Sequence, residues 1–455
     1  TNNFLSFFAT FAYSFKNRYV VNANVRNDAS NVFGQDINHR IDPTYSFGLS
    51  WRASEEAFFQ KHLKWITTLN FRGTFGIQGN ALTRESPELI LSQQGVQPGY
   101  NRYFSTIGQI PNPYLSWERT RNWNFGVDLE LFRMFYMNLE YYTRRSNAVI
   151  TVDLPFEYGI DDMKRNGGII YNRGIEYTLS FTPIQKRDFS LNINLNASKN
   201  WNKGGETKID RNTAMYLRGG STQILKEGYP LSAFWSYSFA GLDGSNGKPM
   251  FNYVEVPDEE KSKSIDPTTY LVYSGETEPY FTGGLGFSFR YKSLSLNTSF
   301  SLLLGSKKRL PSPYSDFQGS GSMMPDPTKN VNRDLLNRWQ KPGDEVYTNI
   351  PGLPTWPIEI GWTLPNTDSA ESAIEMWEKS DAMVVSGSFL RCRNIGLSWQ
   401  MKKEWCDKIH AKNLAINFNM DNIFVIASKR FNGFDPELEN SIMPRSFSLG
   451  LNIGF

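Results

Sequence analysis

Histidine and cysteine are scarce in this sequence, and their scarcity limits the chemistry that the chain can perform. Three histidines are scattered along 455 residues, and there are two cysteines, Cys392 and Cys406. Two cysteines do not form a disulfide framework. A single disulfide between them stays open, since it depends on a geometry that the sequence does not give, and two free thiols are the favoured interpretation. The sequence also contains no Ser/His/Asp arrangement, phosphate-binding loop or zinc-ligand spacing. It therefore predicts no enzyme, no metal site and no cofactor.

Long apolar runs are absent as well. No stretch approaches the roughly 20 residues that a membrane-spanning helix needs, which excludes helical insertion. The 48 basic and 45 acidic residues nearly balance, so there is no electrostatic footprint for nucleic acid. The mean hydropathy of -0.46 resembles that of a soluble protein. This average does not exclude a membrane β-barrel, because strands that alternate apolar and polar residues also give a low mean hydropathy.

Such alternation is what the sequence has in abundance, most clearly in its last ten residues. The odd positions there are large and apolar, and the even positions are polar or small: the apolar ones are Phe447, Leu449, Leu451, Ile453 and Phe455. Side chains alternate between faces along a strand, so this segment has one apolar and one polar face. An amphipathic last strand that ends on an aromatic residue is typical of outer-membrane β-barrels, in which the assembly machinery recognises that strand.

The same pattern recurs along the whole chain, for example over residues 7–15, 19–25, 45–51, 123–131, 189–196 and 294–302. These predicted strands of about 10 to 12 residues are longer than the usual 5 to 6 of soluble sheets. They match the 9 to 11 residues that cross a bilayer at a tilt. We therefore expect apolar residues to face lipid and asparagines to face the lumen. The lipid-facing set is Leu191, Ile193, Leu296, Phe300, Leu449 and Ile453, and the lumen-facing set is Asn192, Asn194, Asn297 and Asn452.

The connections between these strands are of two kinds, which alternate. Short ones are predicted at 16–18, 132–135, 183–188, 291–293 and 401–412, and long ones at 28–42, 79–118, 151–168, 201–221, 242–279, 306–385 and 426–443. Short periplasmic turns opposite long extracellular loops are typical of outer-membrane barrels. Aromatic residues crowd the short end, which indicates an interfacial girdle, although aromatic residues are also frequent in any sheet.

The direction of the first and last strands adds a constraint. Both are predicted to run toward the short-turn end, which requires an odd number of strands. We expect about fifteen, including a pair joined around Glu227-Gly228-Tyr229-Pro230. A closed antiparallel barrel needs an even number. The first strand (4–15) and the last (445–455) should therefore not pair with each other.

An ordered set of short motifs gives a family resemblance over the whole chain. The motifs are LNFRGTFGIQGN (69–80), NPYLSWE (112–118), NRGIEYT (172–178), GYPLSAFWSYSFAGLD (228–243), PYFTGGLGFSFRY (279–291), NRWQKPGD (337–344), FLRCRNIGL (389–397), NIF (422–424) and GFDPE (433–437). With the final strand, they resemble the C-terminal barrel portion of SusC/RagA-type TonB-dependent transporters. Each motif alone is weak, but their order is specific.

The resemblance implies an all-β, transmembrane antiparallel β-barrel of a probable 22 strands in the outer membrane of a Gram-negative bacterium. Residues 1–455 would be the C-terminal part of that barrel, lacking the N-terminal plug domain and the first strands, roughly seven of them. The family imports oligosaccharides or oligopeptides with energy from TonB, which contacts the plug, and a SusD-like surface lipoprotein serves as the lid. The expected partners are thus the lipoprotein, the plug and missing strands, TonB, outer-membrane lipid and the cargo. Two alternatives stay open: a secreted all-β glycan-binding or adhesin module, and a passive porin.

Candidate site residues lie in two of the predicted extracellular loops, 306–385 and the last loop, 426–443. Loop 306–385 combines a helical stretch ending near Trp339 with Trp356 and Trp362 among prolines. Exposed aromatic residues bind sugars and peptides equally well, so we expect substrate binding or lid contact, with loop-to-loop packing as the alternative. Asp435 and Glu437 lie on the last loop. A calcium site needs six to eight oxygens, which is more than this loop supplies. We therefore favour a role in loop packing for the two acids, and a contact with the substrate or the lid is the other role that we consider.

Overall fold

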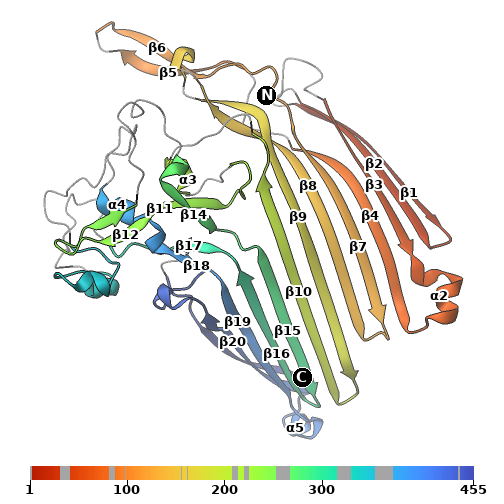
Figure 1. Cartoon of the computed structure of the whole chain (residues 1–455). Coiled ribbons are helices and arrows are strands. Elements are labelled where there is room, and N and C mark those ends of the chain that lie inside the picture. The colour runs from red at the N-terminus through yellow and green to blue at the C-terminus, as the bar shows by residue number, and fades with distance from the viewer. Residues whose placement is uncertain are drawn as a thin grey trace.

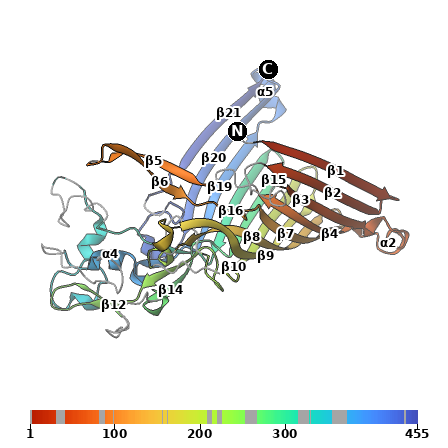
Figure 2. The same cartoon turned by 90° about the horizontal axis from the view of Figure 1, so that it is seen from above.

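The computed structural model describes residues 3–30, 41–80, 88–97, 99–154, 156–160, 162–207, 214–219, 225–252, 267–314, 328, 330–353, 372–438 and 441–455. Its main feature is a sheet of thirteen antiparallel strands. In order across the sheet these are β1 (Phe4–Phe15), β2 (Tyr19–Ser30), β3 (Ile41–Arg52), β4 (Ile66–Asn80), β7 (Glu118–Leu131), β8 (Phe135–Asp153), β9 (Asp162–Gln185), β10 (Phe189–Gly204), β15 (Phe281–Tyr291), β16 (Leu294–Leu304), β19 (Phe389–Gln400), β20 (Asn413–Ile426) and β21 (Ser446–Gly454). The sheet is long, twisted and curved (Figures 1 and 2).

Strands β1 and β21 are the two edges of this sheet and, in the described part of the chain, do not pair with each other. The predicted odd strand number and the unpaired ends are confirmed. The predicted count of about fifteen is wrong. The segment after Pro230 forms β11 (Ala233–Tyr237) and β12 (Phe239–Leu242), which belong to separate two-stranded sheets. All five residues of β11 are buried, whereas a wall strand with two different faces would bury at most alternate residues.

The pairing registers place whole rows of like side chains on each face. Leu191 lies opposite Phe289, which lies opposite Leu296, and the same row continues through Leu397 and Phe418 to Leu449. The adjacent row runs from Asn192 through Ser288 to Asn297. Because successive residues of a strand point to opposite faces, the leucines and the asparagines are on different faces, as predicted. We call them the apolar face and the polar face.

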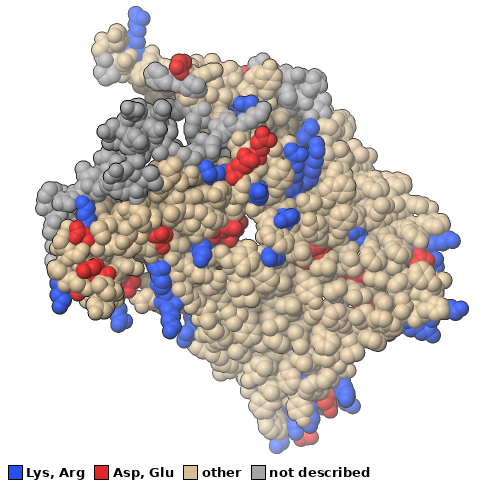
Figure 3. Space-filling model, in the orientation of Figure 1, with Lys and Arg blue, Asp and Glu red and all other residues tan. Residues whose placement is uncertain are grey.

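Charge is distributed in the same way. Figure 3 shows one face of the sheet, on which charged side chains gather at the two ends of the strands and leave the region between almost uncharged. The buried and half-buried ion pairs of the central strands, such as Arg72 with Asp128 and Glu140, lie on the polar face. The face seen in Figure 3 is therefore the apolar one.

Tight turns close one end of the sheet. Lys16 and Asn17 have φ of 49° and 57°, and Phe132 and Arg133 have φ of 53° and 57°. Two consecutive positive φ values are typical of type I′ turns, whose twist matches that of the flanking strands. Two further connections at this end contain short helices, η1 (Ala53–Glu55) with α2 (Ala57–His62), and α5 (Lys403–Lys408). Connection 53–65 was not among the predicted short ones, but α2 and α5 both lie at this end (Figure 1).

The opposite end carries a cluster of loops with its own secondary structure. It contains four small sheets, formed by β5 (Ile90–Gln97) with β6 (Arg102–Gln109), β11 with β14 (Leu271–Glu276), β12 with β13 (Pro249–Phe251), and β17 (Lys307–Arg309) with β18 (Val384–Ser386). Its helices are η2 (Phe156–Tyr158), α3 (Ala214–Leu217), η3 (Pro267–Thr269), η5 (Arg333–Asn337), η6 (Asp344–Val346), α4 (Ala373–Glu378), η7 (Asp381–Met383) and η8 (Lys429–Phe431). None of the helices in the described residues is long and apolar enough to cross a membrane.

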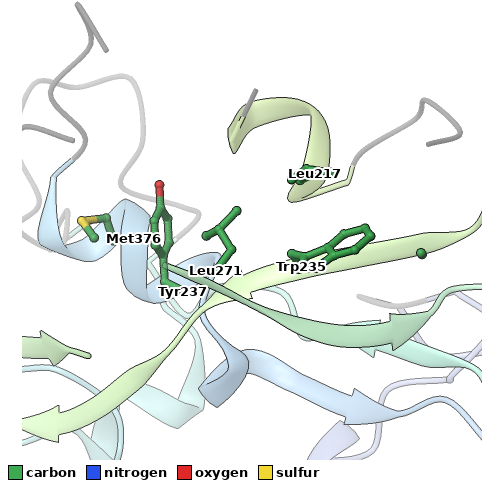
Figure 4. Packing of buried hydrophobic residues seen from close by; sticks show 6 residues of the cluster. Leu217, Trp235, Tyr237, Leu271 and Met376 are labelled. Carbon is green, nitrogen blue, oxygen red and sulfur yellow. The ribbon is translucent and has the colours of Figure 1, made fainter. Parts of the chain in front are cut away.

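The buried apolar core lies in this loop cluster and not on the sheet. One group joins Leu217, Trp235, Tyr237, Leu271 and Met376 from α3, β11, β14 and α4 (Figure 4). A second group joins Tyr314, Leu335, Ile374, Trp377 and Met383. A capping box begins α4, because the Ser372 hydroxyl and the Glu375 carboxylate each accept from the other's backbone N–H. The large apolar side chains of the sheet, in contrast, are mostly exposed or half-buried.

Both cysteines are free, as predicted, and both are buried.

Candidate functional site

Two regions carry the polar chemistry of the chain: the polar face of the sheet and the loop cluster above it. On the polar face, Arg72 Nη1 lies 2.6 Å from Asp128 Oδ2, and Arg72 Nη2 lies 2.7 Å from Glu140 Oε1. Asn138 donates a further hydrogen bond of 2.8 Å to Asp128. Gly126 makes room for this arrangement, since a Cβ there would lie 2.9 Å from Arg72 Nη2. The network is built from β4, β7 and β8, and it ties their polar sides together.

The loop cluster contains a cavity of about 380 Å³ between loop 306–385 and the last loop. Its charged lining residues are already bound within the protein. Arg430 donates to the carbonyl of Val384 at 2.7 Å, Asp334 accepts from Asn432 at 2.6 Å, and Asp381 accepts from the backbone N–H of Phe239 at 3.0 Å. These contacts join the loops around the cavity to one another. Among its aromatic lining residues, Tyr347 is the exposed one.

The structure places Trp339 inside the loop cluster, half-buried. Its indole Nε1 donates to Glu345 Oε2 at 3.1 Å, and its ring covers Gly247, where a Cβ would come within 2.3 Å of the ring. Glu345 accepts backbone hydrogen bonds from its own segment as well as the indole bond, and together they lower the pKa of its carboxyl. This geometry is that of loop-to-loop packing. Trp356 and Trp362 lie outside the described residues.

Apolar side chains are exposed on the two short helices that flank Trp339. Leu336 on η5 is 71% exposed, Val346 on η6 is 77% exposed, and Tyr347 directly after it is 89% exposed. Exposed apolar side chains that lie together often mark a protein interface. The sequence pattern directed attention to the tryptophans, whereas these three exposed side chains beside Trp339 were not among the predicted site residues.

Asp435 and Glu437 take part in a buried ion-pair group with a residue that the sequence analysis missed. Arg391 Nη2 lies 2.7 Å from Asp435 Oδ1 and 2.8 Å from Glu437 Oε2, and the side chains of Arg391 and Asp435 are only 2% and 4% exposed. Burial alone would raise the pKa of the Asp435 carboxyl, but the hydrogen bonds from Arg391 and from the Glu437 and Leu438 amides outweigh it and lower the pKa. The pair fastens the last loop to β19.

This ion pair also explains two of the motifs. Arg391 belongs to the segment FLRCRNIGL and Asp435 to GFDPE, and they meet across 44 positions of sequence. The motif NPYLSWE behaves in a similar way. Asn112 donates to the carbonyl of Lys164 at 2.8 Å, and Asn166 accepts from the backbone N–H of Ser116 at 2.9 Å. The motifs thus hold loops to strands.

A second cation, which is half-buried, anchors the small sheets. Arg309 on β17 donates to the carbonyls of Arg218 at 3.0 Å and Trp235 at 3.2 Å, and to the Ser236 hydroxyl at 3.1 Å. Burial, together with the nearby Arg218 charge, lowers the pKa of Arg309 to about 10. No pattern in the sequence distinguishes this arginine from the neighbouring Lys307 and Lys308.

Comparisons with known proteins agree on one architecture. The family model described as TonB dependent receptor-like, beta-barrel matches residues 1–305. TonB-dependent receptor P3 of Formosa agariphila is 23% identical over 497 residues, which cover 99% of this chain and 45% of the relative. TonB-dependent receptor SusC of Bacteroides thetaiotaomicron is 25% identical over 486 residues, covering 100% of this chain and 44% of the relative. The chain thus spans less than half the length of these curated relatives.

Among solved structures, that of the RagAB peptide transporter superposes with a TM-score of 0.75 at 23% identity, covering 100% of this chain and 48% of that chain. The closed-closed state of the RagAB peptide importer gives a TM-score of 0.73 at 22% identity, covering 99% of this chain and 48% of that chain. At this level of identity the similarity establishes the fold.

Proposed function

Because the chain belongs to the TonB dependent receptor-like β-barrel family, we propose that it forms the C-terminal part of the barrel wall of a SusC-type nutrient importer. The members of this family are outer-membrane transporters and not enzymes. In this proposal residues 1–455 supply barrel wall and extracellular loops, and the plug domain is a separate part of the whole protein.

The observation that carries the proposal is the separation of the two faces of the sheet. The apolar face keeps its large side chains exposed or half-buried over the thirteen strands, while the only extensive apolar cores among the described residues lie in the loop cluster. In water such a surface would associate, because exposed apolar patches of this extent mark a binding surface. In a bilayer it is the surface that contacts lipid, and the polar face then lines an aqueous interior. A secreted adhesin would have no use for this arrangement.

The two open edges indicate how the wall is completed. An unpaired strand edge is costly in hydrocarbon, because its N–H and C=O groups have no water to bind. We propose that further strands of the whole protein pair with β1 and β21. If the barrel has the 22 strands of plugged outer-membrane transporters, the thirteen found here leave about nine to be supplied, in place of the seven that the sequence suggested.

The proposed cargo and partners draw on the relatives and on the family resemblance. The RagAB structure is that of a peptide transporter, and the SusC/RagA resemblance implies oligosaccharides as well as oligopeptides, so we propose one of these two classes as the cargo. We propose a SusD-like lipoprotein as the lid, contacting the exposed side chains of Leu336, Val346 and Tyr347, with TonB acting through the plug. In this proposal Trp339, Asp435 and Glu437 position the loops beneath the lid, and Trp356 and Trp362 remain candidate contacts to the lid or the substrate.

The test is uptake by cells that carry the whole protein. Labelled oligopeptides and oligosaccharides are offered to cells with and without the gene, each in the presence and absence of TonB. The proposal expects uptake of one class that is lost in both deletions. Uptake that persists without TonB would identify a passive porin, and release of the protein from membranes without detergent would identify a secreted module. Replacing Leu336, Val346 and Tyr347 with serine should reduce co-purification of the lipoprotein while leaving the barrel in the membrane.

A further inference from the structure

Five basic side chains lie on the apolar face at the loop end of four neighbouring strands. They are Arg121 on β7, Arg145 on β8, Arg173 on β9, and Lys199 and Lys203 on β10. The registers set them in adjacent rows, with Arg121 opposite Arg145, Arg145 opposite Tyr171, and Tyr171 opposite Lys203. All five are exposed. Figure 3 shows charged side chains, most of them basic, at this end of the strands above the uncharged region.

Aromatic rings lie between these cations. The guanidinium of Arg145 lies 5.9 Å from the centre of the Tyr171 ring, and that of Arg173 lies 5.6 Å from the Trp201 ring. Lys199 Nζ lies 4.9 Å from the same Trp201 ring and 5.6 Å from Tyr280. Tyrosine and tryptophan are enriched where one end of a side chain is in hydrocarbon and the other is in water.

Repulsion between the five cations makes their clustering unfavourable within the chain itself. Arg121 and Arg145 are directly opposed across two strands, and like charges in that position destabilise the pair. None of the five cations forms an ion pair within the described residues. Three carboxylates, Glu206, Glu227 and Glu276, line the adjoining cavity of about 940 Å³ together with Arg173 and Lys203, but they leave the cations in excess. The group is therefore suited to an anion that comes from outside the chain.

The height of the group on the strand identifies the source of that anion. Lys199 is ten residues along β10 from Phe189, which lies beside the short turn. At about 3.3 Å per residue this is about 33 Å along the strand, or about 25 Å along the membrane normal at a tilt of about 40°. That is the height of the apolar band of an outer-membrane barrel. Lys199 thus stands at the outer edge of the hydrocarbon, and Arg173 and Arg145 lie one and two rows further out, level with lipid headgroups.

We propose that this basic–aromatic group binds the phosphate of an anionic lipid in the outer leaflet. Arginine matches the geometry of a phosphate with two parallel hydrogen bonds, and Lys199 can extend its stem along the apolar surface to reach the same headgroup. The acyl chains then cover the apolar rows below, which include Ile175 and Leu195. This inference rests on the proposed membrane location and adds a lipid site that faces away from the transport path.

The test compares two variants of the whole protein that each lose two arginines. R145Q/R173Q removes cations from the apolar face, and R144Q/R290Q removes cations from the polar face of β8 and β15. Each is placed in nanodiscs of phosphatidylcholine with a minor fraction of phosphatidic acid, and retained lipid is counted by native mass spectrometry. We expect the preference for phosphatidic acid to fall on the order of tenfold or more in R145Q/R173Q and to be unchanged in R144Q/R290Q. R173K keeps the charge but loses the paired hydrogen bonds, so the preference should fall less than in R145Q/R173Q.

An equal preference in both double variants, or an equal loss in both, would overturn the inference. Added inorganic phosphate separates the two sources of the anion: complete displacement of the lipid at low concentration would show that a free phosphate, and not a lipid, is the ligand. If the protein enters nanodiscs and imports its cargo but shows no lipid preference, this inference fails alone. If it does not enter a bilayer, the proposed function fails as well.

Discussion

Replacing Asp435 with alanine should release the last loop from the sheet. Asp435 is the nearest partner of Arg391, and both side chains are almost completely buried. Removing one partner of a buried pair usually costs about 3 to 5 kcal/mol, because the other charge is left uncompensated. Glu437 still lies 2.8 Å from Arg391 in the wild type, so we expect the lower end, about 3 kcal/mol. Arg391 Nε already has no hydrogen-bond partner in the structure, so the guanidinium has no spare contact that could compensate for the loss of Asp435.

The loss should be local, since the pair joins one loop to one strand. A decrease of about 3 kcal/mol in the free energy of opening corresponds to roughly a hundredfold faster amide exchange in the loop. The amides of Asp435 and Leu438, which bond to Ser441 and Asp435 carbonyls, report directly on this opening. Hydrogen exchange of a peptide spanning 428–443, measured by mass spectrometry on the folded protein in detergent, provides the assay.

Two further variants sharpen the test. Glu437→Gln affects a side chain that is 31% exposed, so its effect should be below about 1 kcal/mol. Arg391→Met combined with Asp435→Leu removes both buried charges and should restore much of the protection that Asp435→Ala loses. Exchange in Asp435→Ala that matches the wild type would refute the assignment of this pair as the anchor of the loop.

Three other predictions follow from the same structure. The folded-state pKa of Asp435 is lowered, so its contribution to loop stability is present above the unfolded pKa of about 3.9 and is lost as the pH falls through the folded pKa. Protection of the loop amides, corrected for intrinsic exchange, should therefore stay constant from neutral pH down to about 5 and decline only below about 4. Leu195→Arg on the apolar face should destabilise the inserted barrel by roughly 2 to 4 kcal/mol, whereas Asn194→Arg on the polar face should be close to neutral, and equal unfolding midpoints in urea would contradict the assignment of faces. Phe455→Ser removes the apolar side chain that directly follows edge strand β21 and should lower the amount of assembled protein in outer-membrane fractions, and unchanged levels would count against a role in assembly.

The fold of the wall could be predicted from the sequence because its determinants are local. A period of two fixes which side chains share a face, and turn residues such as Lys16 and Asn17 fix where strands reverse. The rows through Leu191 and Asn192 then follow from pairing. The prediction failed in the region after Pro230, since a short apolar segment such as β11 reads equally well as a wall strand or as a buried strand of a loop domain.

The candidate site could be predicted only in part, because its contacts link distant residues. Asp435 and Glu437 stood out as a pair of acids, but their partner Arg391 lies 44 positions away on a strand and gives no local signal. Trp339 stood out as an aromatic residue in a long loop, and only the structure shows that it covers Gly247. The basic side chains of the apolar face were hidden for the opposite reason. Each is an ordinary charged residue near a strand end, and only the registers bring them together.

The location of the apolar core in the loops has a consequence for the order of folding. Its first group draws Leu217 from the middle of the chain together with Met376 near the end, so the mean sequence separation of its contacts is high. Contacts of high sequence separation form slowly, because the loop entropy must be lost before they are gained. Strands β7, β8, β9 and β10 pair with their neighbours in sequence, so their contacts form without that loss of loop entropy. The extracellular cluster should therefore consolidate after the wall around it, as a separate cooperative unit with its own unfolding transition.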